Sequence, residues 1–430
     1  MKVAGIIAEY DPLHNGHIYQ LRAAREKYGA DAVIIILGSD FTQRGLPAVV
    51  DRHARAKWAL THGADLVIGM PIQGGCDSAE GFASSGVGAL AATGVVTDII
   101  FGAETDDLGK LSDIASVLSE PDLSDIIMKK GSTGISYPVI LSEVLSERLG
   151  EDAVCTASSP NNILSIEYLK ALKRTGAAII PHDLKRLGAA HNSVLKSEAL
   201  AMDDKSQDTY DAAYESSKES AGILPTASSS AIRAAYESGD TQSLSEAMPP
   251  DVERDLNLFY KANELIFPID TALLLSERLI SCETYDNIYG VSEDLSNRIK
   301  NMRDGYENTS AFAESLKSKN LTRSHIDRAL CHILLGLRNE DMLSFKAAAY
   351  TPYLNILGIK QGTGEKLLAS VISSSSVPVL TSPKDAAVLS EELISIYKKD
   401  LYACDLYRII KTQKSGRTYP TEYTRRFLKV

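Results

Sequence analysis

Two histidines three residues apart are the first candidates for chemistry in this sequence. His14 and His17 flank Asn15 and Gly16, after an apolar run and before a stretch with helical spacing. At a helix start, side chains three apart lie on one face, and free backbone N–H groups attract an anion. Gly16 would let a phosphate approach the backbone, while both imidazoles donate to its developing charge. The spacing indicates phosphate-transfer chemistry; two histidines that cap a helix are the alternative.

A second cluster, of hydroxyl groups, suits the same chemistry. Three consecutive serines, Ser228, Ser229 and Ser230, are followed one turn later by Arg233. Hydroxyls at a helix start bond its free N–H groups, and an ordinary cap with a surface arginine is the alternative explanation. The cluster resembles the second signature of H-x-G-H nucleotidyltransferases. That resemblance implies that Ser229, Ser230 and Arg233 hold the β- and γ-phosphates of ATP.

Both clusters need a scaffold, and the first 190 residues alternate between strand and helix patterns. Apolar strands are expected at residues 3–10, 31–38, 65–70, 96–102 and 177–181, with helices that include 15–27 and 52–63. This alternation predicts an α/β fold with a doubly wound parallel sheet, Rossmann-like and of the nucleotidyltransferase type. Ligands of such sheets bind beyond the carboxyl ends of the strands, where the loops after Tyr10, Gly38, Gly69 and Phe101 should gather.

The second half of the chain has a different pattern. Residues 196–222 are polar, which predicts a surface insertion. Beyond residue 237 we expect helices at 271–280, 295–303, 310–318, 324–337 and 385–399, and one short strand at 377–380. We therefore expect a catalytic domain over residues 1–240, with its insertion at about 196–222, and a mainly α-helical domain over 241–430. A length of 430 residues suits two domains.

Composition excludes several classes of protein. The net charge of −11 argues against non-specific coating of nucleic acid. The five cysteines form no C-x-x-C pair, so neither a zinc site nor a disulfide framework is indicated. The longest apolar run, residues 32–37, is far shorter than the roughly 20 residues that span a bilayer. We expect a cytoplasmic protein with no membrane segment and no obligate protein partner.

Basic residues gather near the C-terminus, where tyrosines interleave with them. Residues 405–430 hold seven basic and two acidic side chains. This combination suits an RNA backbone with stacked bases, although a solvated segment explains it equally well. The candidate RNA contacts are Lys414, Arg417, Arg425 and Arg426 in this tail, Arg323, His325 and Arg328 at a predicted helix start, and Gln43 and Arg44 after the second strand. A solvated helix face and a polar loop are the alternatives for the last two groups.

Several separated segments are together similar to the bacterial tRNA(Met) cytidine acetate ligase family. They are residues 9–17 (EYDPLHNGH), 41–45 (FTQRG), 77–80 (DSAE), 101–104 (FGAE), 159–164 (SPNNIL), 185–186 (KR), 291–293, 298–299, 321–323, Arg328 and 353–358. The resemblance covers nearly the whole chain. Several motifs in one order are far more specific than a single H-x-G-H match.

The resemblance implies a two-step reaction on elongator tRNA(Met). Acetate attacks the α-phosphate of ATP to give acetyl-adenylate and pyrophosphate. The acetyl group then passes to N4 of the wobble cytidine, C34, and AMP is released. Mg²⁺ would share the charge neutralisation, with no direct protein ligand expected. The resemblance also implies that His14 and His17 are catalytic and that ATP contacts Ile7, Ala8, Glu9, Tyr10, His14, Asn15, Gly16, His17, Gln20, Gly102, Asn161 and Arg186.

Four positions depart from the family's usual pattern. Asp11 stands where the family usually has asparagine, Leu13 where it has phenylalanine, Ser39 where it has glycine and Leu46 where it has glutamate. Asp11 adds a negative charge beside the expected triphosphate, which should weaken ATP binding unless a metal or a lysine offsets it. Two other functions stay open: a small-molecule adenylyltransferase, and an ATP- and RNA-binding protein with weakened catalysis.

Overall fold

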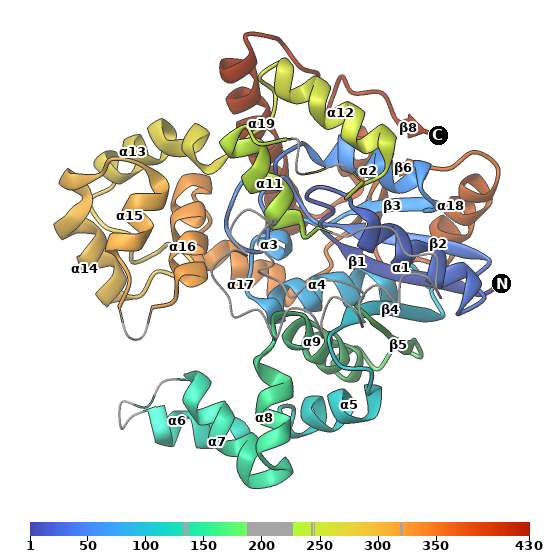
Figure 1. Ribbon diagram of the computed structural model, residues 1–430, viewed down its shortest axis with the longest axis horizontal. Coiled ribbons are helices and arrows are strands. Elements are labelled where there is room, and N and C mark those ends of the chain that lie inside the picture. The colour runs from blue at the N-terminus through green and yellow to red at the C-terminus, as the bar shows by residue number, and fades with distance from the viewer. Residues whose placement is uncertain (132–134, 136, 187–226, 242–243, 245, 319–320) are drawn as a thin grey trace, which may run out of the picture.

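One mixed sheet organises the protein (Figure 1). The computed structural model describes residues 1–131, 135, 137–186, 227–241, 244, 246–318 and 321–430. Within them the strands run in the order β5-β4-β1-β2-β3-β6-β7, and β8 pairs with β6. Their bounds are β1 Val3–Ala8, β2 Ala32–Leu37, β3 Leu66–Gly69, β4 Asp98–Ala103, β5 Ile180–Lys185, β6 Leu354–Ile359, β7 Val379–Leu380 and β8 Leu428–Lys429.

The first five strands form the parallel part of the sheet. β1 pairs in parallel with β2 and β4, while β3 and β5 extend the sheet on either side. All six residues of β2 are buried, as expected for a strand covered on both faces. The predicted α/β class is confirmed. The predicted strand segments overlap the observed ones, although β5 begins at Ile180 and continues to Lys185.

Helices cover both faces because successive side chains of a strand point to opposite sides. Ile34 and Ile36 of β2 pack in the core under α4 (Ala79–Ala92), α5 (Leu108–Val117), α9 (Pro160–Thr175) and α18 (Thr363–Ser374). Val33, Ile35 and Leu37 pack in the opposite core, under α1 (Asn15–Glu26), α2 (Arg52–Thr61), α11 (Ser229–Ser238) and α12 (Pro250–Lys261). One strand thus supplies both hydrophobic layers.

Two helical groups extend from this sandwich (Figure 1). The first follows β4 and contains α6 (Leu123–Gly131), α7 (Tyr137–Leu149) and α8 (Glu151–Ser158). The second, which we call the helical cluster, contains α13 (Ala272–Ser281), α14 (Glu293–Met302), α15 (Thr309–Ser315) and α16 (Arg323–Leu335). These four helices begin and end within three residues of the predicted bounds. Their core also takes in Phe41 and Cys76 from the first half of the chain.

The last part of the chain returns to the sheet. β6 lies antiparallel to β3, so the sheet crosses the predicted domain boundary at residue 240. β7 lies within the strand expected at 377–380, whereas β6 and β8 were not expected. β6 is a short apolar run, and such a run can be a helix segment as easily as a strand. α19 (Glu391–Ser415) begins after its N-cap Ser390, later than predicted, because 3₁₀ segment Pro383–Val388 precedes it. α3 (Ile72–Gly75) and α17 (Asn339–Ala347) complete the α-helices of the described residues.

The polar insertion expected at 196–222 lies outside the described residues. In the ranges that the structure describes, no helix has the length and apolar character needed to cross a membrane.

Candidate active site

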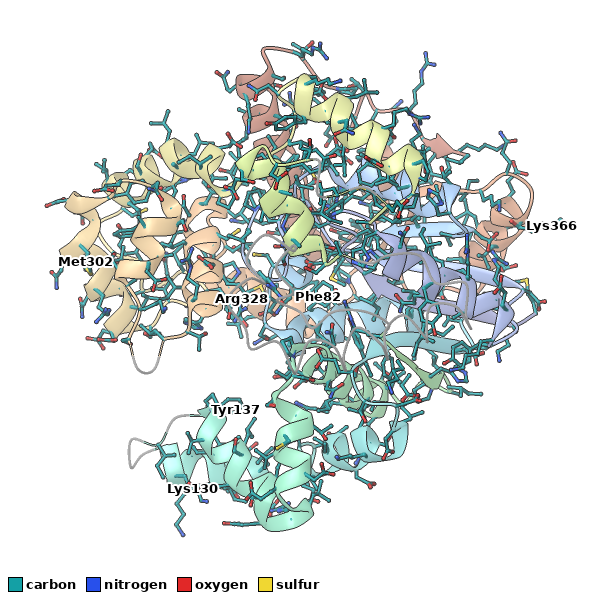
Figure 2. The ribbon with its side chains drawn as sticks, viewed as in Figure 1. Phe82, Lys130, Tyr137, Met302, Arg328 and Lys366 are labelled. Carbon is teal, nitrogen blue, oxygen red and sulfur yellow. The ribbon has the colours of Figure 1, made fainter. Side chains whose placement is uncertain are left out.

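A cavity of about 930 Å³ opens at the carboxyl ends of the parallel strands. All fifteen residues predicted to contact ATP line it, and so do Gln43, Arg44 and Arg328. Figure 2 labels Arg328 of α16 and Phe82 of α4 toward the middle of the molecule, and both belong to the lining. The sheet, the helical cluster and α11 therefore share one cavity.

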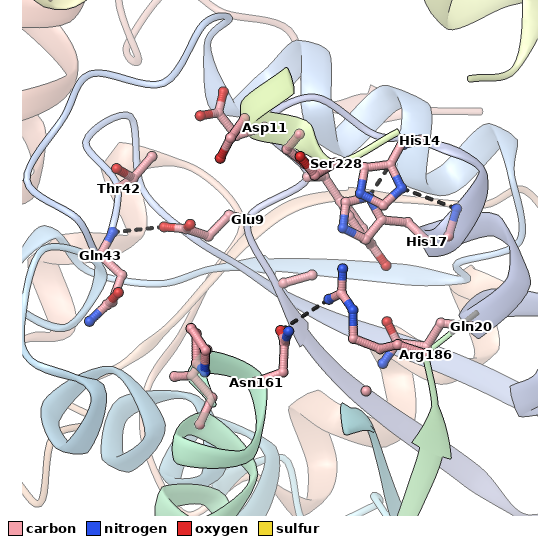
Figure 3. A pocket seen from close by; sticks show the side chains of 18 of the residues that line it. Glu9, Asp11, His14, His17, Gln20, Thr42, Gln43, Asn161, Arg186 and Ser228 are labelled. Carbon is pink, nitrogen blue, oxygen red and sulfur yellow. Dashed lines mark hydrogen bonds between the residues drawn. The ribbon is translucent and has the colours of Figure 1, made fainter. Parts of the chain in front are cut away.

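The histidine pair forms the start of α1 (Figure 3). The Gly16 N–H donates to His14 Nδ1 at 3.1 Å, and the His14 N–H donates to His17 Nδ1 at 3.3 Å. The two rings stack with centroids 3.7 Å apart and planes 18° apart. Because each Nδ1 accepts a hydrogen bond, a neutral ring must carry its proton on Nε2. Both imidazoles are thereby left with one N–H donor each for a ligand.

Both histidines are uncharged at neutral pH. Burial, with the charge of Arg186, lowers the pKa of His14 to about 3. Burial and the neighbouring His14 and Arg186 hold the pKa of His17 well below its ordinary value. The pair thus supplies neutral donors, and the start of α1 adds the partial positive charge of a helix N-terminus. Full positive charge for a triphosphate is available from lining arginines, among them Arg186 and Arg233.

The first of these arginines lies on the same side of the cavity as the histidines (Figure 3). Arg186 Nη1 donates to Asn161 Oδ1 at 3.0 Å, and Asn161 Nδ2 donates to Glu104 Oε1 at 2.8 Å. Arg186 also donates its backbone N–H to the Ala103 carbonyl at 3.0 Å, which continues the pairing of β5 with β4. A Cβ on Gly102 would sit 3.4 Å from Arg186 Cγ, an ordinary contact distance, so the arginine side chain lies directly over this glycine. Three separated motifs meet at this wall.

The start of α11 forms a third wall. Ser228 is its N-cap and accepts from the Ala231 N–H at 3.2 Å. Ser229 Oγ donates to the Pro12 carbonyl at 3.2 Å, and Arg233 Nη2 donates to Ser230 Oγ at 3.2 Å. The second signature is therefore attached directly to the loop that carries the first. Ser228, which was noted as a cap, also lines the cavity.

The charge of Asp11 is offset by an arginine, not by the metal or lysine that the sequence left open. Arg233 Nη1 lies 3.1 Å from Asp11 Oδ2 and also donates to the Asp11 carbonyl. The Val49 N–H donates to Asp11 Oδ1 at 2.7 Å. Asp11 is buried, and both of its oxygens are occupied by protein donors. Its negative charge is consequently neutralised before any nucleotide arrives.

The loop after β2 joins the sheet to the helical cluster. The Gln43 N–H donates to Glu9 Oε1 at 2.7 Å, and the Thr42 N–H donates to the Leu46 carbonyl at 2.8 Å. Gly45 has φ of 79°, and a Cβ there would collide with the backbone of α16 at Asp327 and Arg328. Burial, together with the charge of Arg233, lowers the pKa of Arg44. Only glycine lets this loop seat directly on α16.

The other predicted RNA contacts lie outside the cavity lining. Arg323 is held within the helical cluster, by Asp327 at 2.9 Å and Glu314 at 3.2 Å. His325 is half-buried, and burial with the charge of Arg328 lowers its pKa. In the tail, Lys414 pairs with Asp270 at 2.7 Å, Arg417 with Glu264 at 3.0 Å and Arg425 with Glu422 at 3.7 Å, while Arg426 is exposed.

The cavity also has lining residues outside the motifs found in the sequence. They include Tyr168, Ile266, Phe267 and Pro268. The last three reach the cavity because the Ile266 N–H donates to the Val49 carbonyl at 3.0 Å, a contact with no sequence signature. Among the described residues, no group of three or more His, Cys, Asp or Glu could hold a metal ion.

Comparison with known proteins places this geometry in a family. The family model described as HIGH Nucleotidyl Transferase matches residues 1–202 and 210–421. The tRNA(Met) cytidine acetate ligase of Acetivibrio thermocellus is 31% identical over 100% of both chains. That of Thermosipho africanus is 30% identical over 97% of both. The chain belongs to the tRNA(Met) cytidine acetate ligase family.

Solved structures agree with this membership. Thermotoga maritima TmcAL bound with alpha-thio ATP aligns with a TM-score of 0.86 at 25% identity, covering 100% of this chain and 99% of the other. The apo form of the same protein aligns with a TM-score of 0.87 at 25% identity over 100% of both chains. The resemblance drawn from the sequence is confirmed, and the cytidine acetate ligase family is a family of ATP-dependent enzymes of the nucleotidyltransferase fold.

Proposed function

We propose that this protein acetylates N4 of the wobble cytidine C34 of elongator tRNA(Met), using ATP and acetate. The observation that carries the proposal is the meeting of both nucleotidyltransferase signatures, with Arg186, in one cavity of about 930 Å³. A volume near the upper end of the range for ligand pockets leaves space beside a nucleotide for a second reactant. Family membership supplies the reaction class.

In the first step an acetate oxygen bonds to the α-phosphorus of ATP, and the bond to the β-phosphate breaks. Charge builds on the departing pyrophosphate, where donors fixed in advance lower the barrier most. His14 and His17 offer neutral Nε2–H groups there, and Arg186 and Arg233 offer charge. Because Arg233 is shared with Asp11, we expect its pull on the phosphates to be weaker than that of an unpaired arginine.

Mg²⁺ would accompany the ATP and neutralise its phosphates. The described lining carboxylates form no cluster of three, which fits the habit of Mg²⁺ to be bound by substrate phosphates and water more than by a protein cage. We further propose that the enzyme works in the cytoplasm, where tRNA and ATP are found, and without an obligate protein partner. For tRNA we propose contacts at Gln43, Arg44 and Arg328, which line the cavity.

The test is incorporation of labelled acetate into tRNA in the presence of ATP. Elongator tRNA(Met) should be labelled, and the same tRNA with uridine at position 34 should not. Without tRNA, acetate should drive exchange of pyrophosphate into ATP. Pyrophosphate release that ignores acetate would favour a small-molecule adenylyltransferase, and tight ATP binding without turnover would favour a binding protein.

A further inference from the structure

Two carboxylates follow β1 at the cavity, and they differ in their partners. Both oxygens of Asp11 are occupied, by Arg233 and by the Val49 N–H. Glu9 has one oxygen fixed, because the Gln43 N–H donates to Oε1 at 2.7 Å. Within the part of the chain that the structure describes, its Oε2 receives no donor. Glu9 lines the cavity, so this oxygen is open to a ligand.

The neighbouring arginine does not neutralise Glu9. Arg55 is fully buried, and it donates to three backbone carbonyls, those of Glu9 at 2.7 Å, Ser39 at 2.7 Å and Val50 at 3.1 Å. It therefore fixes the main chain that carries the carboxylate and leaves the carboxylate itself unpaired. Gly38, in the adjoining strand end, has no side chain, and a Cβ there would lie 3.3 Å from Glu9 Cγ. Gly38 thus leaves room for the Glu9 side chain, and the Gln43 N–H fixes its direction.

Glu9 lies away from the groups that suit the triphosphate (Figure 3). The view places it beside Thr42 and Gln43, whereas His14, His17 and Arg186 gather on the other side of the cavity. The Gln43 loop is also the wall that meets the helical cluster at Gly45. A second reactant bound at this wall, which Gln43, Arg44 and Arg328 line, would lie nearer to Glu9 than to the histidines.

We infer that Glu9 Oε2 recognises the N4 amino group of the wobble cytidine and takes its proton during acetyl transfer, an inference that rests on the function proposed above. In that step a C–N bond forms between N4 and the acetyl carbon, the bond from that carbon to the AMP phosphate oxygen breaks, and N4 loses one proton. A carboxylate is the side chain that accepts from cytosine N4. Uracil has a carbonyl oxygen at that position, which repels a carboxylate and carries no proton.

The surroundings of Glu9 suit a base. Burial raises the pKa of Glu9, and the nearby charge of Asp11 raises it further. The Gln43 N–H, Arg55 and Arg233 lower the pKa, but the net shift is upward. The charged and titratable groups that act on Glu9, or on which Glu9 acts, are Asp11, Arg44, Arg55, Tyr168 and Arg233. A carboxyl group with a raised pKa accepts a proton more readily in the transition state, and general bases of this kind contribute about 10²–10⁴-fold.

The two half-reactions separate this role from nucleotide binding. Acetate-dependent pyrophosphate exchange reports adenylation, and single-turnover transfer from enzyme preloaded with ATP and labelled acetate reports the second step. Glu9→Gln keeps an acceptor for the Gln43 N–H but cannot take a proton. We expect transfer to fall at least about 100-fold, and by a clearly larger factor than exchange, which reports any contact that Glu9 makes with ATP.

The pH profile provides the decisive readout. Wild-type transfer should rise with pH as Glu9 loses its proton, and Glu9→Gln should lack that rise. Glu9→Asp retains a carboxylate, so its transfer rate should be lower but should still rise with pH. This variant provides the test if Glu9→Gln is unstable. Equal falls in both half-reactions, or unchanged transfer, would overturn the role of Glu9. A wild-type enzyme that adenylates no acetate or labels no tRNA would overturn the proposed function as well.

Discussion

Two regions of the molecule are rich in charge and use it in opposite ways. At the cavity, His14, His17 and Glu9 each keep a polar atom open to a ligand. Between α19 and α2, the charged side chains pair with one another. Buried Arg52 forms ion pairs with Asp400 and Glu422, each at 3.0 Å. Lys411 of α19 joins this second region by pairing with Asp51 at 3.1 Å and Glu264 at 3.5 Å.

The difference separates the charged and polar groups that can act on a ligand from those that stabilise the fold. We call the second region, made of Arg52, Asp51, Asp400, Lys411 and Glu422, the charge clamp. A paired and buried charge contributes to stability or specificity and has nothing left for a ligand. In the basic C-terminal segment that suggests RNA binding in the sequence, Lys411 belongs to this clamp and Lys414 is paired with Asp270. Variants in the two regions should therefore fail in different assays.

Breaking the clamp should have the largest effect. Arg52→Ala leaves Asp400 buried without its cation, and removing one partner of such a pair costs about 3–5 kcal/mol. We expect urea denaturation to show a fall of that size in the free energy of unfolding, with ATP affinity unchanged in the folded fraction. Arg254→Ala, which removes an exposed pair with Asp255, is the control and should stay within about 0.5 kcal/mol. A similar loss for both variants would contradict the distinction.

The matching change in the cavity should remove activity and spare stability. His14→Asn keeps a good helix cap for the Gly16 N–H but loses the imidazole donor. Loss of one preorganised donor costs about 10²–10³-fold in rate, and we expect that fall in acetate-dependent pyrophosphate exchange. Thermal unfolding should match the wild type. Exchange within threefold of wild type would show that the histidine is only a cap.

Acid should weaken the clamp through Glu422. Burial opposes ionisation, but Arg52 and His53 dominate and hold the pKa of Glu422 below its ordinary value of 4.5. A depressed pKa means that this stabilisation is complete above about pH 4.5 and is lost as pH falls toward the folded-state pKa. Glu422→Gln should reduce the slope of unfolding free energy against pH by up to about 1.4 kcal/mol per pH unit below 4.5. An unchanged slope would exclude Glu422 from the acid response.

The smallest effect should come from substituting the basic residues proposed or considered as RNA contacts. Arg328 lines the cavity, whereas Arg417 is paired with Glu264. We expect Arg328→Ala to weaken tRNA binding by about 1 kcal/mol and to reduce the slope of log affinity against log salt by about 1. For Arg417→Ala, the changes in tRNA affinity and in salt slope should both be less than half of those for Arg328→Ala. Filter binding over a salt series checks this, and equal slopes for both variants would mean that the tail also meets phosphate.

The parallel part of the fold was predictable because its signals are local. β1 to β4 are short apolar runs bounded by turn residues, and α1 follows a recognisable cap. β6 was not predicted because no local pattern within residues 354–359 indicates that they pair with β3, which is far away in sequence. β3 and β6 lie on either side of residue 240, and no local pattern indicates their pairing, since strand partners are selected by tertiary packing.

The site was predictable where strand ends carry motifs, and less so elsewhere. The fifteen nucleotide-binding residues converge because parallel strands present their carboxyl ends at one edge. Their contacts with ATP stay a prediction. The neutralisation of Asp11 by Arg233 was not visible, because the sequence does not give the distance between the two signatures. The contribution of Phe267 depends on a backbone contact with Val49 and has no pattern of its own.

The pairing of β3 with β6 also constrains synthesis on the ribosome. Gly69 is followed by 284 residues before Leu354 is added. At about 5–20 residues per second, the nascent chain carries β3 without its neighbour for roughly 15–60 s. An exposed strand edge is a template for aggregation, so chaperone occupancy of the growing chain should be highest in that interval and end once β6 emerges.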